Sequence, residues 1–213
     1  MEHLDLETAR TWYPQADAVH GFDHILRVLR LAERLALAEG ADLEIVRAAA
    51  LLHDAQDPQE GEGERLTHHR ASAAFAGRVL AADGWGAERI AAVQHCIRAH
   101  RFRDRREPPE SIEAQVLFDA DKLDAIGAIG VARALAYAVQ AGNPFYARPS
   151  KRFLEHGETE PGEPHSAYHE YVFKLRRIQE RLFTDSGRRL AADRHAAMAA
   201  YFERLAAELE GEA

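Results

Sequence analysis

The sequence predicts an all-α protein, and three of its features carry that prediction. Alanine, leucine, arginine and glutamate dominate the composition, β-branched residues are sparse, and the chain lacks runs in which apolar and polar residues alternate. The dominant residues favour helices, whereas alternation is the usual signal of a half-buried strand. With 213 residues and 46% hydrophobic content, the chain is also long enough to bury a sizeable core.

The first predicted helices are separated by clear turn signals. Apolar residues from Ile25 to Ala36 follow the spacing of one helical face, and this pattern ends at Gly40. Leu43 to Leu52 is apolar almost all round, as in a buried helix, and it is followed directly by His53 and Asp54. Similar signals predict further helices over residues 67–82, 87–100, 111–140, 166–183 and 187–209. Four prolines predict that Gly142 to Pro164 has no regular structure.

The charge balance narrows the classes of function. The chain has 27 basic and 35 acidic side chains, a formal net charge of −8, which argues against a general binder of nucleic acid or anionic membranes. An anionic substrate would therefore need a local basic or metal site. No apolar run approaches the roughly 20 residues that span a bilayer, and the first residues do not resemble a signal peptide, so we expect a cytoplasmic protein.

Histidine and aspartate residues supply the expected chemistry. The single cysteine, Cys96, excludes an internal disulfide and a thiolate zinc cluster. His24 lies at the start of the first amphipathic helix, and His53 and Asp54 follow the buried helix. Asp121 lies on a helical stripe of largely apolar residues. One divalent cation bound by these two imidazoles and two carboxylates would satisfy all four groups, and the mixed set suits manganese, iron, cobalt, nickel or zinc.

Two other aspartates lie near Asp121. Asp124 shares its stripe with Leu117 and Ala128, so a second carboxylate is expected to point the same way. Asp119 competes with Asp121 as the ligand, and the stripe favours Asp121.

Three strings, in this order, resemble the HD-domain metal-dependent phosphohydrolase superfamily. They are His24-Ile-Leu-Arg-Val28, Ala49-Ala-Leu-Leu-His-Asp54 and Asp119-Ala-Asp-Lys-Leu-Asp-Ala-Ile-Gly-Ala128, within a match from about residue 18 to 133. The last string resembles the bacterial subgroup that includes nucleotide pyrophosphohydrolases. The similarity continues through residues 164–171, so the resemblance implies a single HD domain over 1–213, with a metal-binding core at about 18–140 and a helical C-terminal extension at about 141–213.

The resemblance implies an enzyme that hydrolyses a phosphate ester or phosphoanhydride, with a small phosphate substrate, most directly a nucleotide. It favours pyrophosphate release from nucleoside triphosphates by a metal-activated water. Manganese is the first expectation for the metal, with magnesium, cobalt, nickel, iron and zinc as alternatives. Phosphomonoester hydrolysis by the same fold, a di-iron oxygenase and a non-catalytic nucleotide sensor remain open, as does the oligomeric state.

The resemblance also suggests roles for residues around the metal. Asp57 occupies the place of an acidic residue that handles a proton near the metal-bound water. His20 is either a helix cap or a group beside the metal or substrate. His68 and His100 are each a second-metal ligand, a phosphate contact or a buried core histidine. The phosphate contact is slightly favoured, because the resemblance is strongest to mononuclear hydrolases. Lys122 and Asp124 are expected beside the metal or the substrate, where Lys122 would neutralise phosphate oxygens.

Overall fold

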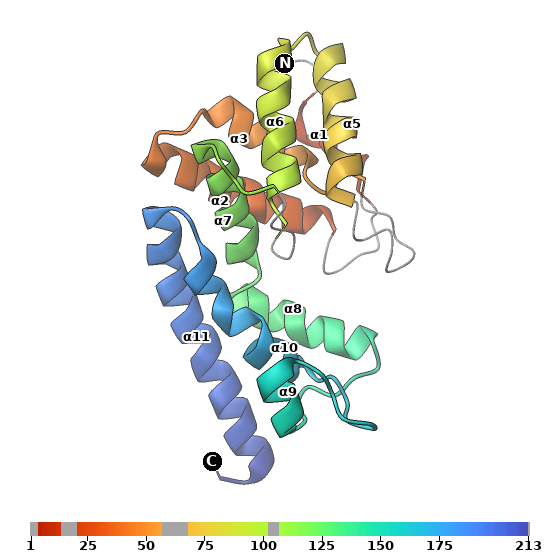
Figure 1. Ribbon diagram of the computed structural model, residues 1–213, viewed down its shortest axis with the longest axis vertical. Helices are drawn as coiled ribbons and strands as arrows, with labels where there is room; N and C mark the ends of the chain where they lie inside the picture. Colours follow the sequence, from red (N-terminus) through yellow and green to blue (C-terminus); the bar gives the residue numbers. More distant parts are fainter. Residues whose placement is uncertain (1–3, 14–20, 57–67, 102–106, 213) are drawn as a thin grey trace. The chain divides into compact units, whose positions relative to one another are not determined.

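The computed structural model is built of helices (Figure 1). It describes residues 4–13, 21–56, 68–101 and 107–212, and no strand occurs within them. The all-α prediction is therefore confirmed. The expected roles of His20 and Asp57 fall on residues outside these ranges, and the side chain of His68 is likewise not described.

The chain divides into two compact units. The first unit comprises the described parts of Met1–Lys122 together with Phe183–Gly187, and the second comprises Leu123–Leu182 with the described part of Arg188–Ala213. A short segment from late in the sequence thus completes the first unit.

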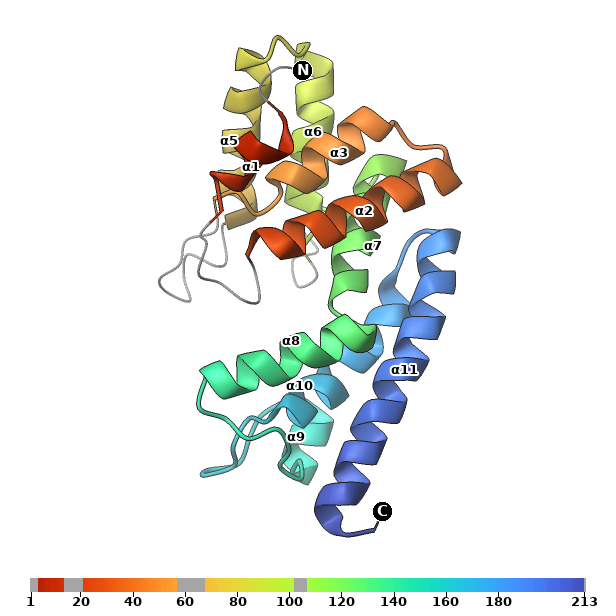
Figure 2. The ribbon, with the colours of Figure 1, turned by 180° about the vertical axis from the view of Figure 1, so that it is seen from behind.

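The first unit surrounds a buried central helix, α3. Both views show α5 and α6 side by side, and α3 contacts α2, α5 and α6 (Figures 1 and 2). Its helices are α1 (Leu6–Arg10), α2 (Phe22–Glu39), α3 (Leu43–Leu52), α5 (His68–Ala82), α6 (Ala87–Ala99) and most of α7 (Ile112–Asp124).

Local sequence signals explain the turn between α2 and α3. Gly40 ends α2 in the left-handed conformation with φ of 71°, which glycine adopts without steric cost. Asp42 then caps α3, because its carboxylate accepts hydrogen bonds from the backbone N–H groups of Glu44 and Ile45. Fully buried Ile25 and Leu52 place the two helices in one apolar core, as the sequence predicted.

The predicted helix over residues 111–140 is wrong, because the chain breaks between α7 and α8 (Gly127–Gln140). Gly127 adopts a φ of 77°, and a Cβ there would lie 3.0 Å from Cγ of Arg194. Across this break, the Arg133 guanidinium in α8 donates a hydrogen bond of 2.6 Å to the carboxylate of Asp124, the last residue of α7. The stripe that joined Asp124 to Ala128 on one continuous helix is therefore interrupted.

The second unit also departs from prediction. Residues 142–164 contain a short helix, α9 (Lys151–His156), which Ser150 caps by accepting from the Phe153 N–H. The expected helix over 166–183 is shorter, because α10 (Ala167–Phe173) gives way at Lys174 to a 3-10 helix, η1 (Leu175–Arg181). The last helix, α11 (Asp185–Glu210), agrees closely with the prediction.

A buried polar network holds the loop before α10. His169 is fully buried and lies 2.8 Å from the Ser166 hydroxyl through Nδ1 and 2.9 Å from the Glu163 carboxylate through Nε2. Glu163 also accepts from the backbone N–H groups of Ser150 and Glu160. These hydrogen bonds order a proline-rich segment that carries little regular structure of its own.

Within the described residues, no single helix is both long and apolar enough to cross a membrane. The bent pair α7 and α8 passes the same test on length and composition alone. Core helices of soluble proteins pass it too, so this result is weak evidence for a membrane segment.

Candidate metal centre

The first unit brings five predicted site residues together from four helices. His24 lies in the first turn of α2, His53 and Asp54 follow α3, His100 follows α6, and Asp121 lies near the end of α7. One ligand atom from each of His24, His53 and Asp121 lies within 4.8 Å of the other two. Asp54 Oδ2 lies 3.4 Å from His53 Nε2 and 3.9 Å from His24 Nε2.

His53 provides the test of whether these residues suit a metal ion. Its ring is fully buried, and Nδ1 lies 2.9 Å from the carbonyl oxygen of Ala50, so Nδ1 carries the proton and donates it. The other ring nitrogen, Nε2, therefore faces the carboxylates. This nitrogen is buried and has no hydrogen-bond partner among the described residues. A cation would satisfy it, and two imidazoles with two carboxylates form a set that divalent transition metals accept.

His100 repeats this arrangement at the end of α6. Its Nδ1 lies 2.5 Å from the carbonyl oxygen of Ile97, which leaves Nε2 facing Asp54 Oδ1 at 3.5 Å. Burial lowers the pKa of His100, and this effect exceeds the opposing influence of Asp54. The ring is therefore neutral at neutral pH and offers a lone pair to the centre rather than a proton.

The two carboxylates of the centre remain ionised. Burial alone would raise the pKa of Asp54, but the imidazoles of His53, His100 and His24 hold it well below its usual value. The pKa of Asp121 is also lowered, because Lys122 and His24 outweigh the effect of burial. Lys122 contacts Asp121 Oδ2 directly and lies 5.4 Å from the centre of the Phe118 ring. A compact region of negative charge thus faces the imidazole nitrogens.

Asp119 and Asp121 have different surroundings, although the sequence left them as competitors. Asp119 is fully buried and accepts hydrogen bonds from the backbone N–H groups of Phe183 and Thr184, at 2.9 and 2.8 Å. The Thr184 hydroxyl donates to the same carboxylate at 2.7 Å and accepts from the Gly187 N–H. Asp119 therefore anchors residues 183–187 to α7, two positions before Asp121.

Asp124 is the predicted residue that the structure leaves outside the cluster. Its carboxylate is buried and pairs with Arg133 in the second unit. This contact fixes the beginning of α8 to the end of α7, so Asp124 has a structural partner that the sequence pattern did not reveal.

Tyr13 is a neighbour of the centre that sequence reasoning missed. Its hydroxyl donates to the carbonyl of Leu51 at 2.7 Å, and burial together with the charge of Asp54 raises its pKa well above the usual value. The contact joins residues 38 positions apart, and no periodic pattern marks it. Tyr13 supports the end of α3 immediately before His53.

The chain is similar to known proteins in both sequence and structure. Residues 21–126 match the family model of the HD domain. The Bacillus subtilis protein YpgQ is 34% identical over 212 residues, covering 96% of this chain and 94% of YpgQ. The crystal structure of YpgQ in complex with ADP matches 98% of this chain and 100% of that one with a TM-score of 0.74. An HD-superfamily hydrolase from Bacillus thuringiensis is 27% identical, with 96% of each chain covered and a TM-score of 0.68.

The helical fold and the His-Asp cluster define a protein of the HD class. The chain belongs to the HD-domain phosphohydrolase superfamily, and its structural relatives support a hydrolase.

The Asp119 anchor generates a stability prediction. Asp119→Ala leaves two backbone N–H groups and one hydroxyl without their acceptor, so we expect a loss of about 2–4 kcal/mol in the free energy of unfolding. Thr184→Val removes one donor to Asp119 and the acceptor of the Gly187 N–H, and it should cost less, about 1–2 kcal/mol. Urea denaturation of both variants measures the difference. If Asp119→Ala were as stable as the wild type, the anchor would have no energetic role.

Proposed function

We propose that the chain is a metal-dependent phosphohydrolase acting on nucleotides, with His24, His53, Asp54 and Asp121 as the metal ligands. The buried, unpartnered Nε2 of His53 beside two ionised carboxylates is the observation that carries the proposal. A divalent cation in this set would lower the pKa of a bound water and polarise a phosphoryl oxygen. Manganese is our first choice of metal.

The favoured substrate is a nucleoside triphosphate. Attack of water on the α-phosphorus would break its bond to the bridging oxygen and release pyrophosphate and a nucleoside monophosphate. Two findings support a nucleotide: the resemblance of the Asp119–Ala128 string to pyrophosphohydrolases, and the crystal structure of YpgQ with ADP. Phosphomonoester hydrolysis is the near alternative, because the same centre suits both reactions.

Other residues of the chain would handle charge and protons. Lys122 is mostly buried beside Asp121, and its ammonium group would offset negative charge on the phosphate as the leaving group departs. Asp57 follows Asp54 by three residues and is proposed to accept the proton of the attacking water.

Removal of the metal tests the ligand set. We expect EDTA to abolish hydrolysis, and His53→Ala and Asp54→Ala to lose both bound metal and activity, because each variant removes one of four ligands. His156→Ala is the matched control, since this imidazole is 66% exposed and belongs to the second unit. Metal analysis by mass spectrometry decides the result. Full metal occupancy in the His53 and Asp54 variants would refute the ligand assignment.

The role of Asp57 is separable from that of the ligands. Asp57→Asn should keep normal metal content and lower kcat by about 10²- to 10⁴-fold, the range for loss of a general acid or base. The assay should use a panel of nucleotides and phosphate esters and distinguish pyrophosphate from phosphate. An unchanged kcat would exclude proton transfer by Asp57, and loss of metal would make it a ligand or a support for the site.

His100 decides between one metal ion and two. Because its Nδ1 is held by Ile97, its Nε2 lone pair suits a second metal ion better than it suits a phosphate oxygen at neutral pH. This observation also keeps a di-iron oxygenase as the second candidate function. If His100 binds a second ion, the wild type holds two metals per chain and His100→Ala holds one. A single metal in the wild type would contradict this role.

Analysis of the purified wild-type protein distinguishes a hydrolase from an oxygenase. Iron in the purified protein, oxygen uptake and no phosphate release would favour the oxygenase. Nucleotide binding without turnover under every metal tested would instead favour a sensor.

A further inference from the structure

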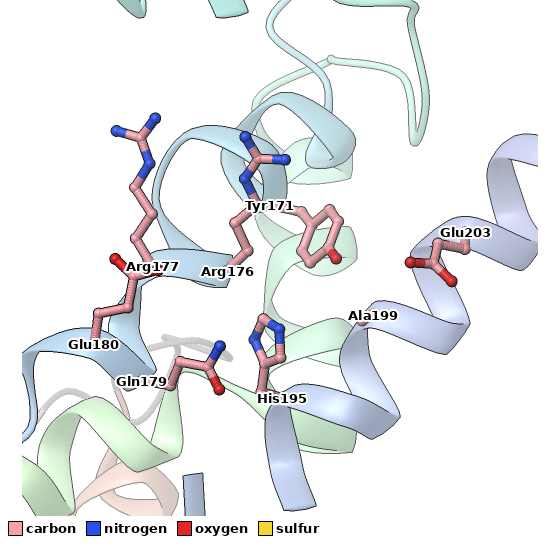
Figure 3. A pocket seen from close by; sticks show the side chains of 8 residues that line it. All are labelled: Tyr171, Arg176, Arg177, Gln179, Glu180, His195, Ala199 and Glu203. Carbon is pink, nitrogen blue, oxygen red and sulfur yellow. The ribbon is translucent and has the colours of Figure 1, made fainter. Parts of the chain in front are cut away.

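A cavity that is open to solvent lies wholly within the second unit and shares no residue with the metal centre. It has a volume of about 390 Å³, within the usual range of small-molecule sites, and its walls come from α10, η1 and α11 (Figure 3). The lining residues are Tyr171, Arg176, Arg177, Gln179, Glu180, His195, Ala199 and Glu203.

Two polar groups of this cavity have no hydrogen-bond partner among the described residues, and one of them, His195 Nδ1, is a buried atom. Tyr171 is only 6% exposed and its ring stacks on Phe202 at 4.6 Å, but its hydroxyl forms no hydrogen bond with any described residue. His195 Nδ1 is buried and also has no partner in the described part of the chain. An unsatisfied buried polar group is costly, so a water or a ligand group is expected at His195 Nδ1.

The polar side chains converge from three elements. In Figure 3 the amide of Gln179, the ring of His195, the phenol of Tyr171 and the carboxylate of Glu203 point toward the same space. Burial, with the nearby charge of Glu203, raises the pKa of Tyr171, so the phenol stays protonated and can both donate and accept. A ligand with hydroxyl groups would satisfy this set of donors and acceptors.

Two arginine side chains lie at the rim of the cavity. The Arg176 and Arg177 side chains extend away from His195 along one side of the cavity (Figure 3). Neither guanidinium forms an ion pair with a carboxylate among the described residues, although Arg177 lies 5.4 Å from the centre of the Phe173 ring. Unpaired guanidinium groups at the edge of a polar cavity suit an oxyanion, which accepts their N–H groups in pairs.

We propose that this cavity binds a small polyhydroxyl ligand that carries an oxyanion, either phosphate or carboxylate. The oxyanion lies on Arg176 and Arg177, and the hydroxyl groups contact Tyr171, Gln179, His195 and Glu203. The inference is independent of the proposed hydrolase activity, because it uses none of the metal-centre residues.

Isothermal titration calorimetry on the full chain, treated with EDTA, tests the proposal with three probes. D-Ribose 5-phosphate and D-glucuronate carry the two oxyanions on similar hydroxyl frames, and D-ribose carries none. We expect saturable binding of at least one of the first two and none of ribose. Which of the two binds more tightly identifies the oxyanion. If neither probe saturates, or if ribose binds as tightly as they do, the proposal is wrong.

Variants locate the binding. Arg176→Ala removes a charged hydrogen bond and should raise the dissociation constant by about tenfold or more, and Tyr171→Phe removes only a hydroxyl and should raise it by about fivefold. Arg189→Ala is the matched control, an exposed arginine of the same unit that does not line the cavity. Circular dichroism verifies folding, and Tyr171→Phe retains the stacked ring. Wild-type affinity in both cavity variants, or loss of binding in His53→Ala, would overturn the assignment.

Discussion

The metal centre depends on how two helices end. His53 and His100 are each the first residue beyond a helix, and each donates its Nδ1 proton to a carbonyl three residues earlier. These are carbonyls that the last turn of a helix leaves without a backbone partner. One hydrogen bond therefore caps the helix, fixes the tautomer and aims the Nε2 lone pair at Asp54. The cost of ordering two buried rings is offset by a bond that the helix needs in any case.

The other polar groups of the metal centre complement these two imidazoles. Two imidazole lone pairs attract a cation, and Asp54 and Asp121 supply the negative charge that lets one bind. Their ionisation depends on neighbours within the same unit, with Lys122 in contact with Asp121 and three imidazoles around Asp54. Asp119 secures α7 from its other side through residues 183–187. The position of Asp121 is thus set by contacts that reach more than 60 positions along the chain.

The sequence predicted those features that depend on neighbouring residues. The ends of α2 and α3 were predictable because Gly40 and the His53-Asp54 pair act locally. The break before Gly127 was missed because both flanking segments favour helix, and only the Asp124–Arg133 contact reveals what the interruption does. α9 was missed because the prolines of residues 142–164 outweighed the weak signal of the serine that caps this six-residue helix. The order of His24, His-Asp and Asp121 predicted the cluster, but neither tautomers nor the orientation of Asp119 follow from residue order.

A buried cluster of this composition is itself an argument about function. An apolar core would be more stable than two ionised carboxylates and an unpartnered imidazole nitrogen, because each buried charge or unsatisfied group costs free energy. Such a cluster is expected where a bound cation offsets this free-energy cost and where the chemistry of that cation is useful. A sensor that only bound nucleotide could obtain its affinity from surface cations and hydrogen bonds, without a buried donor set. The convergence of these five groups within one unit therefore favours a catalytic centre over a binding module.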